Sequence, residues 1–103
     1  MAQEKIIVQV DRDLEDLIPL FLDSRQQDLA GLAKAIATEN LDALRSIGHD
    51  MKGTGSSFGF HTVSEIGDQI EVAAQAGDLQ TIRTQFGIFQ DYMRRFEIKY
   101  VEN

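Results

Sequence analysis

The chain has 103 residues, and its 17 acidic against 10 basic side chains give a formal net charge of −7 at neutral pH. We expect a single domain over residues 1–103, because the chain is too short to build two hydrophobic cores. The acidic excess argues against binding to the phosphate backbone of nucleic acids, and the absence of cysteine excludes disulfides and thiolate metal ligands.

The sequence contains no segment typical of membrane insertion or export. Its longest apolar run is far too short to cross a bilayer, and residues 1–5 lack the basic and apolar regions of a secretory segment. We therefore expect a cytoplasmic protein, which the lack of cysteine also favours. Its partners should be other proteins and not nucleic acids or membranes.

The two ends of the chain read as short β-strands. Residues 4–10 include a β-branched run, and residues 96–100 alternate apolar with charged side chains at a period of two. We expect these two segments to pair with each other in a small sheet. The alternative for residues 96–100 is a continuation of the last helix.

A helical pattern begins soon after the first of these segments. Apolar residues recur at helical spacing from Leu14 to Ile36, and Asp11 is a suitable N-cap before them. Pro19 interrupts the pattern, because a proline inside a helix loses a backbone hydrogen bond and clashes with the preceding turn. We therefore expect a short first helix that breaks or kinks at Pro19, followed by a long helix.

Capping residues predict where the next two helices begin. Asn40 is a good N-cap for a helix from near Leu41 to near Gly59. Thr62 and Glu65 stand at the spacing of a capping box, in which each residue satisfies a free amide at the helix start. The third long helix is therefore expected to begin at Thr62.

Gly77 is expected to end that helix, and Asp78 to cap the last one. The apolar residues of the last helix repeat at alternating spacings of three and four, a pattern that favours near-antiparallel packing. They are Leu79, Ile82, Phe86, Phe89, Met93 and Phe96. Because all connections are short, the sequence predicts an all-α, up-and-down four-helix bundle with a short extra N-terminal helix.

The most unusual stretch is residues 48–60, which hold four of the chain's eight glycines and the first of its two histidines, His49. Glycine disfavours a helix, but the apolar residues keep helical spacing and predict a helix that runs through the glycines. These apolar residues are Leu44, Ile47, Met51 and Phe58. At about 100° per residue, His49 lies roughly opposite this stripe and should face water.

Four residues lie three, four or seven positions from His49, the spacings that bring side chains together on a helix surface. They are Arg45, Lys52, Gly53 and Ser56. The exposed imidazole thus has a cation on one side and, at Gly53, a patch without a side chain. Such a surface suits an anionic group carried on a ring nitrogen while a second molecule approaches. We expect Arg45 and Ser56 to take part in binding that molecule.

At these residues the chain resembles the histidine-containing phosphotransfer (HPt) domain family. The motifs that carry the resemblance are His49-x-x-Lys52-Gly53, Phe58-Gly59-Phe60 and Ile70-Glu71. Their spacing matches across about a third of the chain, and the helical pattern outside them fits as well. The resemblance implies a free-standing phosphorelay protein with a helical-bundle fold.

The resemblance also implies a function for each residue of the site. His49 would accept a phosphoryl group from the aspartyl phosphate of one receiver domain and pass it to another. Lys52 would act electrostatically on the phosphoryl group, Gly53 would leave room for it, and Glu71 would hydrogen-bond the imidazole. The partners would be response-regulator receiver domains or a hybrid histidine kinase, with Mg²⁺ on the receiver. The chain itself would be a monomeric phosphocarrier without an ATP site or cofactor of its own, and not an enzyme.

Other functions fit less well. A helical adaptor that binds a protein through the same helix face without phosphorylation is the alternative. Sensor-kinase dimerisation helices also carry a phosphorylated histidine, but the proline-bearing turn and the ATP-binding domain of that class are missing. His49 and His61 have no third ligand at a recognisable spacing, so we expect no metal site and assign His61 to a turn or cap. A P-loop would need a lysine where Thr54 stands.

Overall fold

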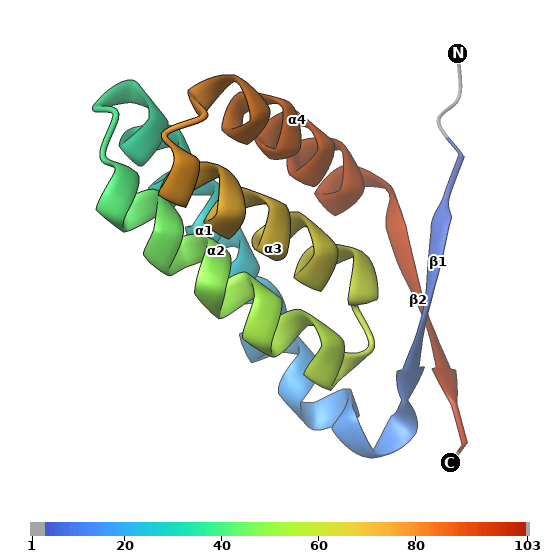
Figure 1. Ribbon diagram of the computed structural model, residues 1–103. Helices are drawn as coiled ribbons and strands as arrows, with labels where there is room; N and C mark the ends of the chain where they lie inside the picture. The colour runs from blue at the N-terminus through green and yellow to red at the C-terminus, as the bar shows by residue number, and fades with distance from the viewer. Residues whose placement is uncertain (1–3, 103) are drawn as a thin grey trace.

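The computed structural model describes residues 4–102. In this part of the chain four α-helices form a bundle, and a two-stranded β-sheet lies beside it (Figure 1). The helices are α1 (Ile18–Ala37), α2 (Leu41–Gly55), α3 (His61–Ala76) and α4 (Leu79–Arg95). The strands are β1 (Ile6–Asp11) and β2 (Phe96–Val101), and two short 3-10 helices are η1 (Arg12–Leu17) and η2 (Ser56–Phe58). The predicted all-α bundle with a small pairing of the chain ends is confirmed.

Successive helices run in opposite directions and are joined by short connections (Figure 1). Their apolar stripes meet in one core, to which β1 contributes Val8 and Val10. Burying a large apolar side chain of this kind stabilises the fold by roughly 1.5–3 kcal/mol. The largest fully buried side chains include Phe60, Phe89, Leu32, Leu44, Met51, Ile70 and Ile82.

The short first helix is the 3-10 helix η1, and it passes at Ile18 directly into α1, where the backbone changes from 3-10 to α-helical. Asp11 caps η1 as predicted, because its Oδ1 accepts a hydrogen bond from the Asp13 amide at 2.9 Å. Pro19 lies in the first turn of α1. Backbone N–H groups in the first turn of a helix have no intrahelical partner, so the N–H that proline lacks is not missed there. Proline therefore favours the start of a helix at this position.

The predicted caps of α2 and α4 are confirmed. Asn40 Oδ1 accepts a hydrogen bond from the Ala43 amide at 3.1 Å, and Asp78 Oδ1 accepts one from the Thr81 amide at 3.1 Å. The Thr81 hydroxyl also donates to Asp78 Oδ2 at 2.6 Å, and these bonds lower the pKa of Asp78. Gly77 ends α3 in the left-handed conformation that glycine adopts at no steric cost, with φ of 71°.

The capping box predicted at Thr62 and Glu65 is wrong. α3 begins one residue earlier, at His61, and Phe60 occupies the N-cap position without a side-chain cap. Phe60 is fully buried, and its carbonyl accepts hydrogen bonds from two amides in the first turn. Burial of one phenyl ring therefore decides where α3 starts. His61, expected in a turn or cap, is an exposed first residue of the helix.

The two strands pair in parallel, with Ile6 opposite Phe96 and Asp11 opposite Val101. β2 continues in the direction of α4, and β1 runs towards the end of the bundle where α1 starts, so the strands share one direction (Figure 1). The predicted pairing of the chain ends is confirmed, and a continuation of the last helix through residues 96–100 is wrong. Phe96, placed in the last helix by the heptad pattern, is the first residue of β2.

β1 passes directly over the connection between α2 and α3, and Gly59 makes this close approach feasible. Gly59 has φ of 86°, and a Cβ at this position would lie only 2.7 Å from the carbonyl oxygen of Gln9. Any other residue would suffer both backbone strain and a steric clash. Gly59 thus joins the end of η2 to α3 beneath the strand.

The apolar stripe of α4 packs largely as predicted. Ile82, Phe89 and Met93 are buried, and Leu79 is partly buried against the core. Tyr92 was not predicted in the core, yet it is buried there, and the loss of water contact raises its pKa to about 12. Across residues 4–102, no helix, α4 included, is both long and apolar enough to cross a membrane.

Candidate functional site

His49 projects from the outer side of α2, and 70% of its side chain is exposed. Leu44 and Met51, on the other side of the same helix, are fully buried. The predicted orientation of His49 is therefore confirmed. Its Nδ1 lies 2.9 Å from Oε2 of Glu71, which projects from α3. Among residues 4–102, Nδ1 is the ring nitrogen of His49 that has a hydrogen-bond partner.

The contact with Glu71 selects one tautomer of the imidazole. An ionised carboxylate accepts hydrogen bonds and donates none, so Nδ1 must carry the proton in the neutral ring. The lone pair then lies on Nε2, the nitrogen without a protein partner. The Glu71 side chain is only 14% exposed, and a covered carboxylate holds the ring more firmly than a freely moving one. In the neutral ring, Nε2 is therefore the nitrogen with a lone pair available for bonding.

Lys52 lies between two carboxylates of α3. Its Nζ is 3.1 Å from Asp68 Oδ1 and 3.9 Å from Glu71 Oε1. The hydrogen bond to Asp68, together with the negative charges of both carboxylates, raises the pKa of Lys52. Asp68 was not identified from the sequence. Its position three residues before Glu71, and therefore on the same face of a helix, is the signal that would have found it.

A seam of glycines between α2 and α3 brings these groups together. Gly48 and Gly55 lie on α2; Gly67 of α3 faces Gly48, and Gly55 lies against the backbone of Phe60 and Ser64. A Cβ at Gly67 would lie 2.5 Å from the backbone nitrogen of Lys52 and 2.6 Å from the carbonyl oxygen of Gly48. A Cβ at Gly48 would lie 2.8 Å from the backbone nitrogen of Glu71. The two backbones therefore touch, which places the Glu71 carboxylate within reach of the imidazole.

Gly67 was also missed in the sequence. The seven-residue spacing of Gly48 and Gly55 puts them on one face of α2 and is the signal for a closely packed helix partner. The complementary glycine on α3 cannot be recognised without knowing which helices are neighbours.

The family model for the Hpt domain matches residues 16–97, a range that contains all four α-helices. The chain belongs to the Hpt domain family. Hpt domains are phosphocarriers of phosphorelays and interact with receiver domains and histidine kinases. Comparison of the chain with curated proteins and with solved structures gave no match.

The other two residues predicted at the site of this Hpt domain are both exposed, but they differ in their surroundings. Arg45 lies one turn before His49 on α2. Ser56 follows the end of α2, and its amide and hydroxyl both donate to Ser64 Oγ, at 2.7 and 2.8 Å. Ser64 donates in turn to the carbonyl oxygen of Lys52 at 2.8 Å. Ser56 is thus part of the link between α2 and α3, and a contact of either residue with a partner remains a prediction.

On the opposite side of α2 from His49, Arg25 connects α1 to the same stretch of the helix. Its guanidinium is buried and donates to Asp28 Oδ2 at 2.6 Å and to Thr54 Oγ1 at 2.8 Å. Thr54 donates to the carbonyl oxygen of Asp50, the residue after His49. Burial raises the pKa of Asp28, an effect that the positive charge of Arg25 only partly offsets. The Arg25 contacts hold the site-bearing part of α2 in place from behind.

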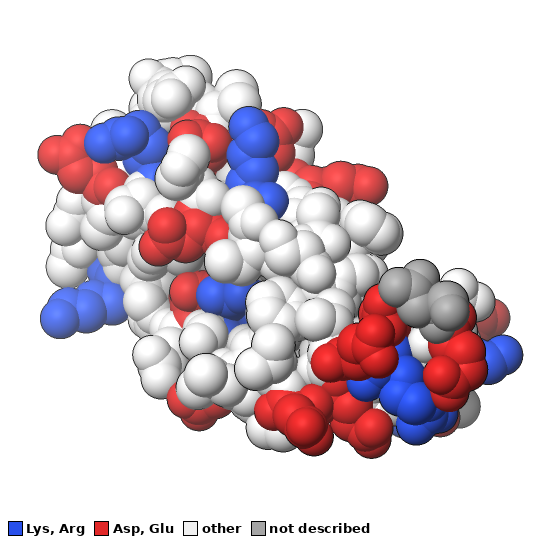
Figure 2. Space-filling model, turned by 90° about the horizontal axis from the view of Figure 1, so that it is seen from below, with Lys and Arg blue, Asp and Glu red and all other residues white. Residues whose placement is uncertain are grey.

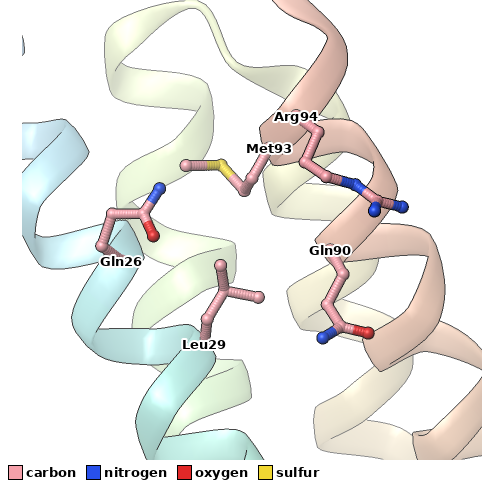
Figure 3. Close-up of a pocket in the computed structure, with 5 residues that line it drawn as sticks. All are labelled: Gln26, Leu29, Gln90, Met93 and Arg94. Carbon is pink, nitrogen blue, oxygen red and sulfur yellow. The ribbon is translucent and has the colours of Figure 1, made fainter. Parts of the chain in front are cut away.

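His49 lies on an exposed part of the surface. A groove of about 260 Å³ between α1 and α4 is lined by Gln26 and Leu29 on one side and by Gln90, Met93 and Arg94 on the other (Figure 3). A second groove, of about 200 Å³, is lined in part by the exposed side chains of Leu17 and Leu20. The face of the molecule seen from below has a broad uncharged area between charged groups (Figure 2). Neither groove is lined by His49. An open position suits a large partner better than a small enclosed substrate.

Gly53 differs from the seam glycines because a Cβ there would meet nothing within 4 Å. Gly53→Ala should therefore stabilise the protein by up to about 1 kcal/mol, since alanine is the better helix former. The added methyl lies one turn from His49 and should crowd a phosphoryl group or an approaching partner. We expect a higher melting temperature together with slower phosphoryl transfer, and still slower transfer with valine or leucine. An unchanged transfer rate would remove Gly53 from the site, and a lower melting temperature would reveal a packing role.

Proposed function

We propose that this Hpt domain carries a phosphoryl group on Nε2 of His49, which it receives from the aspartyl phosphate of one receiver domain and passes to another. One observation carries the proposal: Nδ1 of the exposed imidazole lies 2.9 Å from the mostly covered Glu71 carboxylate, and donation from Nδ1 leaves the lone pair on Nε2. An imidazole held in this way needs no further base to act as a nucleophile.

The transfer step can be written with these groups alone. The Nε2 lone pair attacks the phosphorus atom, the bond between phosphorus and the aspartyl oxygen breaks, and its electron pair stays on the receiver carboxylate. The ring becomes a phosphorylated imidazolium that keeps its proton on Nδ1, from which it donates a hydrogen bond to the Glu71 carboxylate. The reverse of the same step delivers the phosphoryl group to the next receiver. Mg²⁺ and the acidic pocket belong to the receiver in this proposal.

The remaining residues of the site act on the phosphoryl group and on access to it. Lys52 lies one turn from His49 and brings a positive charge near the place where the phosphoryl oxygens come to lie. Gly53 leaves an open patch beside the ring, and Arg45 is a second exposed cation on α2. In this proposal the partner docks on the outer face of α2 around these residues. A monomeric state and a cytoplasmic location are part of the proposal.

Intact-mass measurement tests the function directly. The domain is mixed with a receiver that has been charged with acetyl phosphate and Mg²⁺, and with acetyl phosphate alone as the control. We expect one added phosphoryl group only when the receiver is present, with the lability in acid and stability in alkali that a phosphohistidine shows. Peptide mapping should place it on His49. A stable complex with the receiver without any phosphoryl adduct would instead favour a helical adaptor, and no interaction at all would contradict both.

Replacing Lys52 with alanine should slow transfer in both directions, by about ten-fold, and leave a measurable residual rate. The nucleophile is intact, so only the electrostatic stabilisation of the moving phosphoryl group is lost. Rapid-quench kinetics with a phosphorylated receiver measure the effect. Lys99→Ala on β2 removes the same charge from an exposed strand position and is the matched control. Equal rates for both variants would make Lys52 an ordinary surface residue.

A further inference from the structure

The ion pair between Lys52 and Asp68 is the shortest contact of the Lys52 ammonium, and the carrier function does not by itself require it. Their charged atoms are 3.1 Å apart, whereas Glu71 is 3.9 Å from the same ammonium. Without a phosphoryl group on His49, Lys52 is therefore held chiefly by Asp68. A phosphoryl group on Nε2 would introduce a doubly charged anion that attracts the same ammonium.

The two carboxylates beside Lys52 differ in their freedom to release it. Glu71 is only 14% exposed and is bound to the imidazole, so it stays in place when the ring is phosphorylated. Asp68 is 43% exposed and Lys52 is 52% exposed. A contact between two side chains this exposed is weak and forms and breaks readily. Asp68 is therefore the partner that Lys52 can exchange for a phosphoryl oxygen.

We propose that Asp68 competes with the phosphoryl group on His49 for the Lys52 ammonium and thereby weakens the hold of His49 on that group. This inference rests on the proposed function and adds a positioning residue that acts through Lys52. Asp68 also weakens phosphoryl binding to His49 in a second way, because its own negative charge repels the phosphoryl oxygens. Together they keep the phosphoryl group transferable and prevent it from being trapped on the carrier.

The inference predicts the direction in which the transfer equilibrium moves. Asp68→Asn should shift the phosphoryl group from the receiver towards His49. The equilibrium constant for transfer from the receiver to His49 should rise about two- to five-fold, as expected for exposed charges. Asp68→Glu keeps the charge and should stay near the wild-type value. The increase should shrink at about 1 M salt, where charges are screened over roughly 3 Å. The increase caused by Asp68→Asn should also shrink in a Lys52→Ala background, since the ammonium for which Asp68 and the phosphoryl group compete is then missing.

The measurement is the distribution of labelled phosphoryl groups between the domain and a phosphorylated receiver at equilibrium. Glu97→Gln on β2 is the control for net charge, because it removes one acid from an exposed position outside α2 and α3. An equilibrium constant for Asp68→Asn equal to that of Glu97→Gln would overturn the inference. A constant that falls would also overturn it and would show that Asp68 holds Lys52 in its working position.

A second readout separates the failure of this inference from the failure of the carrier function. Phosphoramidate phosphorylates exposed histidines chemically, and peptide mapping identifies molecules modified on His49. In those molecules the carboxyl ¹³C resonance of Asp68 should move when Lys52 leaves it, and should move much less in Lys52→Ala. An unmoved resonance overturns the inference even where receivers transfer normally. A moved resonance supports it even where no receiver tested phosphorylates the domain.

Discussion

Replacing His49 with glutamine should abolish phosphoryl uptake from a phosphorylated receiver while leaving the fold intact. Glutamine has no nucleophilic ring nitrogen, so the bond to phosphorus cannot form. The side chain of His49 is 70% exposed, and substitutions at such positions usually change the free energy of unfolding by less than about 0.5 kcal/mol. The glutamine side chain also keeps an N–H group that can donate a hydrogen bond to Glu71. Intact mass after incubation and a thermal melt followed by circular dichroism check both parts.

His61→Gln is the matched control for this experiment. His61 is the other histidine of the chain and is exposed at the start of α3. The His61→Gln substitution should leave phosphoryl uptake unchanged. Uptake that survives in His49→Gln and disappears in His61→Gln would move the phosphorylation site to α3. A loss of several degrees in the melting temperature of His49→Gln would show that the imidazole supports the fold.

Gly67→Ala should destabilise the protein although alanine is the better helix former. The new Cβ would lie 2.5 Å from the backbone nitrogen of Lys52 and 2.6 Å from the carbonyl oxygen of Gly48, so α2 and α3 must move apart. Overpacking of this kind costs about 1–3 kcal/mol, and each kcal/mol lowers the melting temperature of a domain this size by about 4–8 °C. The separation should also carry Glu71 away from the imidazole and slow transfer. Thermal melts and transfer kinetics measure the two effects.

Gly87→Ala controls for helix propensity, because a Cβ at this position on α4 would meet nothing within 4 Å. Its melting temperature should rise slightly or stay the same. If Gly67→Ala melted as high as Gly87→Ala, the seam would not be as tight as the structure shows. If Gly67→Ala lowered stability without slowing transfer, the position of Glu71 would not depend on the seam.

Much of this fold follows from local rules that act along the chain. The spacing of apolar residues predicts α2 through its glycines and turns His49 outward, because the geometry of a helix is the same wherever it packs. Asn40 and Asp78 cap the helices predicted for them, since a cap is completed within four residues. Pro19 marks the start of α1 because the effect of proline on the backbone is also local.

Local rules were wrong where contacts with a distant segment outweighed local propensity. Thr62 and Glu65 have the right spacing for a capping box, but α3 starts at His61 because Phe60 enters the core. Phe96 continues the heptad of α4 by spacing, and its amide still donates to the Tyr92 carbonyl, yet its extended backbone begins β2 opposite Ile6. Each choice depends on a segment distant in sequence.

The amino-acid sequence by itself determined the four helices, the outward position of His49 and the cation one turn away. Tertiary structure alone decided how closely the side chains of α3 approach those of α2. Glu71 reaches Nδ1, and Asp68 reaches Lys52, only because Gly67 lets the backbones of α2 and α3 touch. A helix face can be read from the spacing of residues along one segment. The contact of two faces depends on which helices become neighbours and how closely they pack, and the shared core determines both.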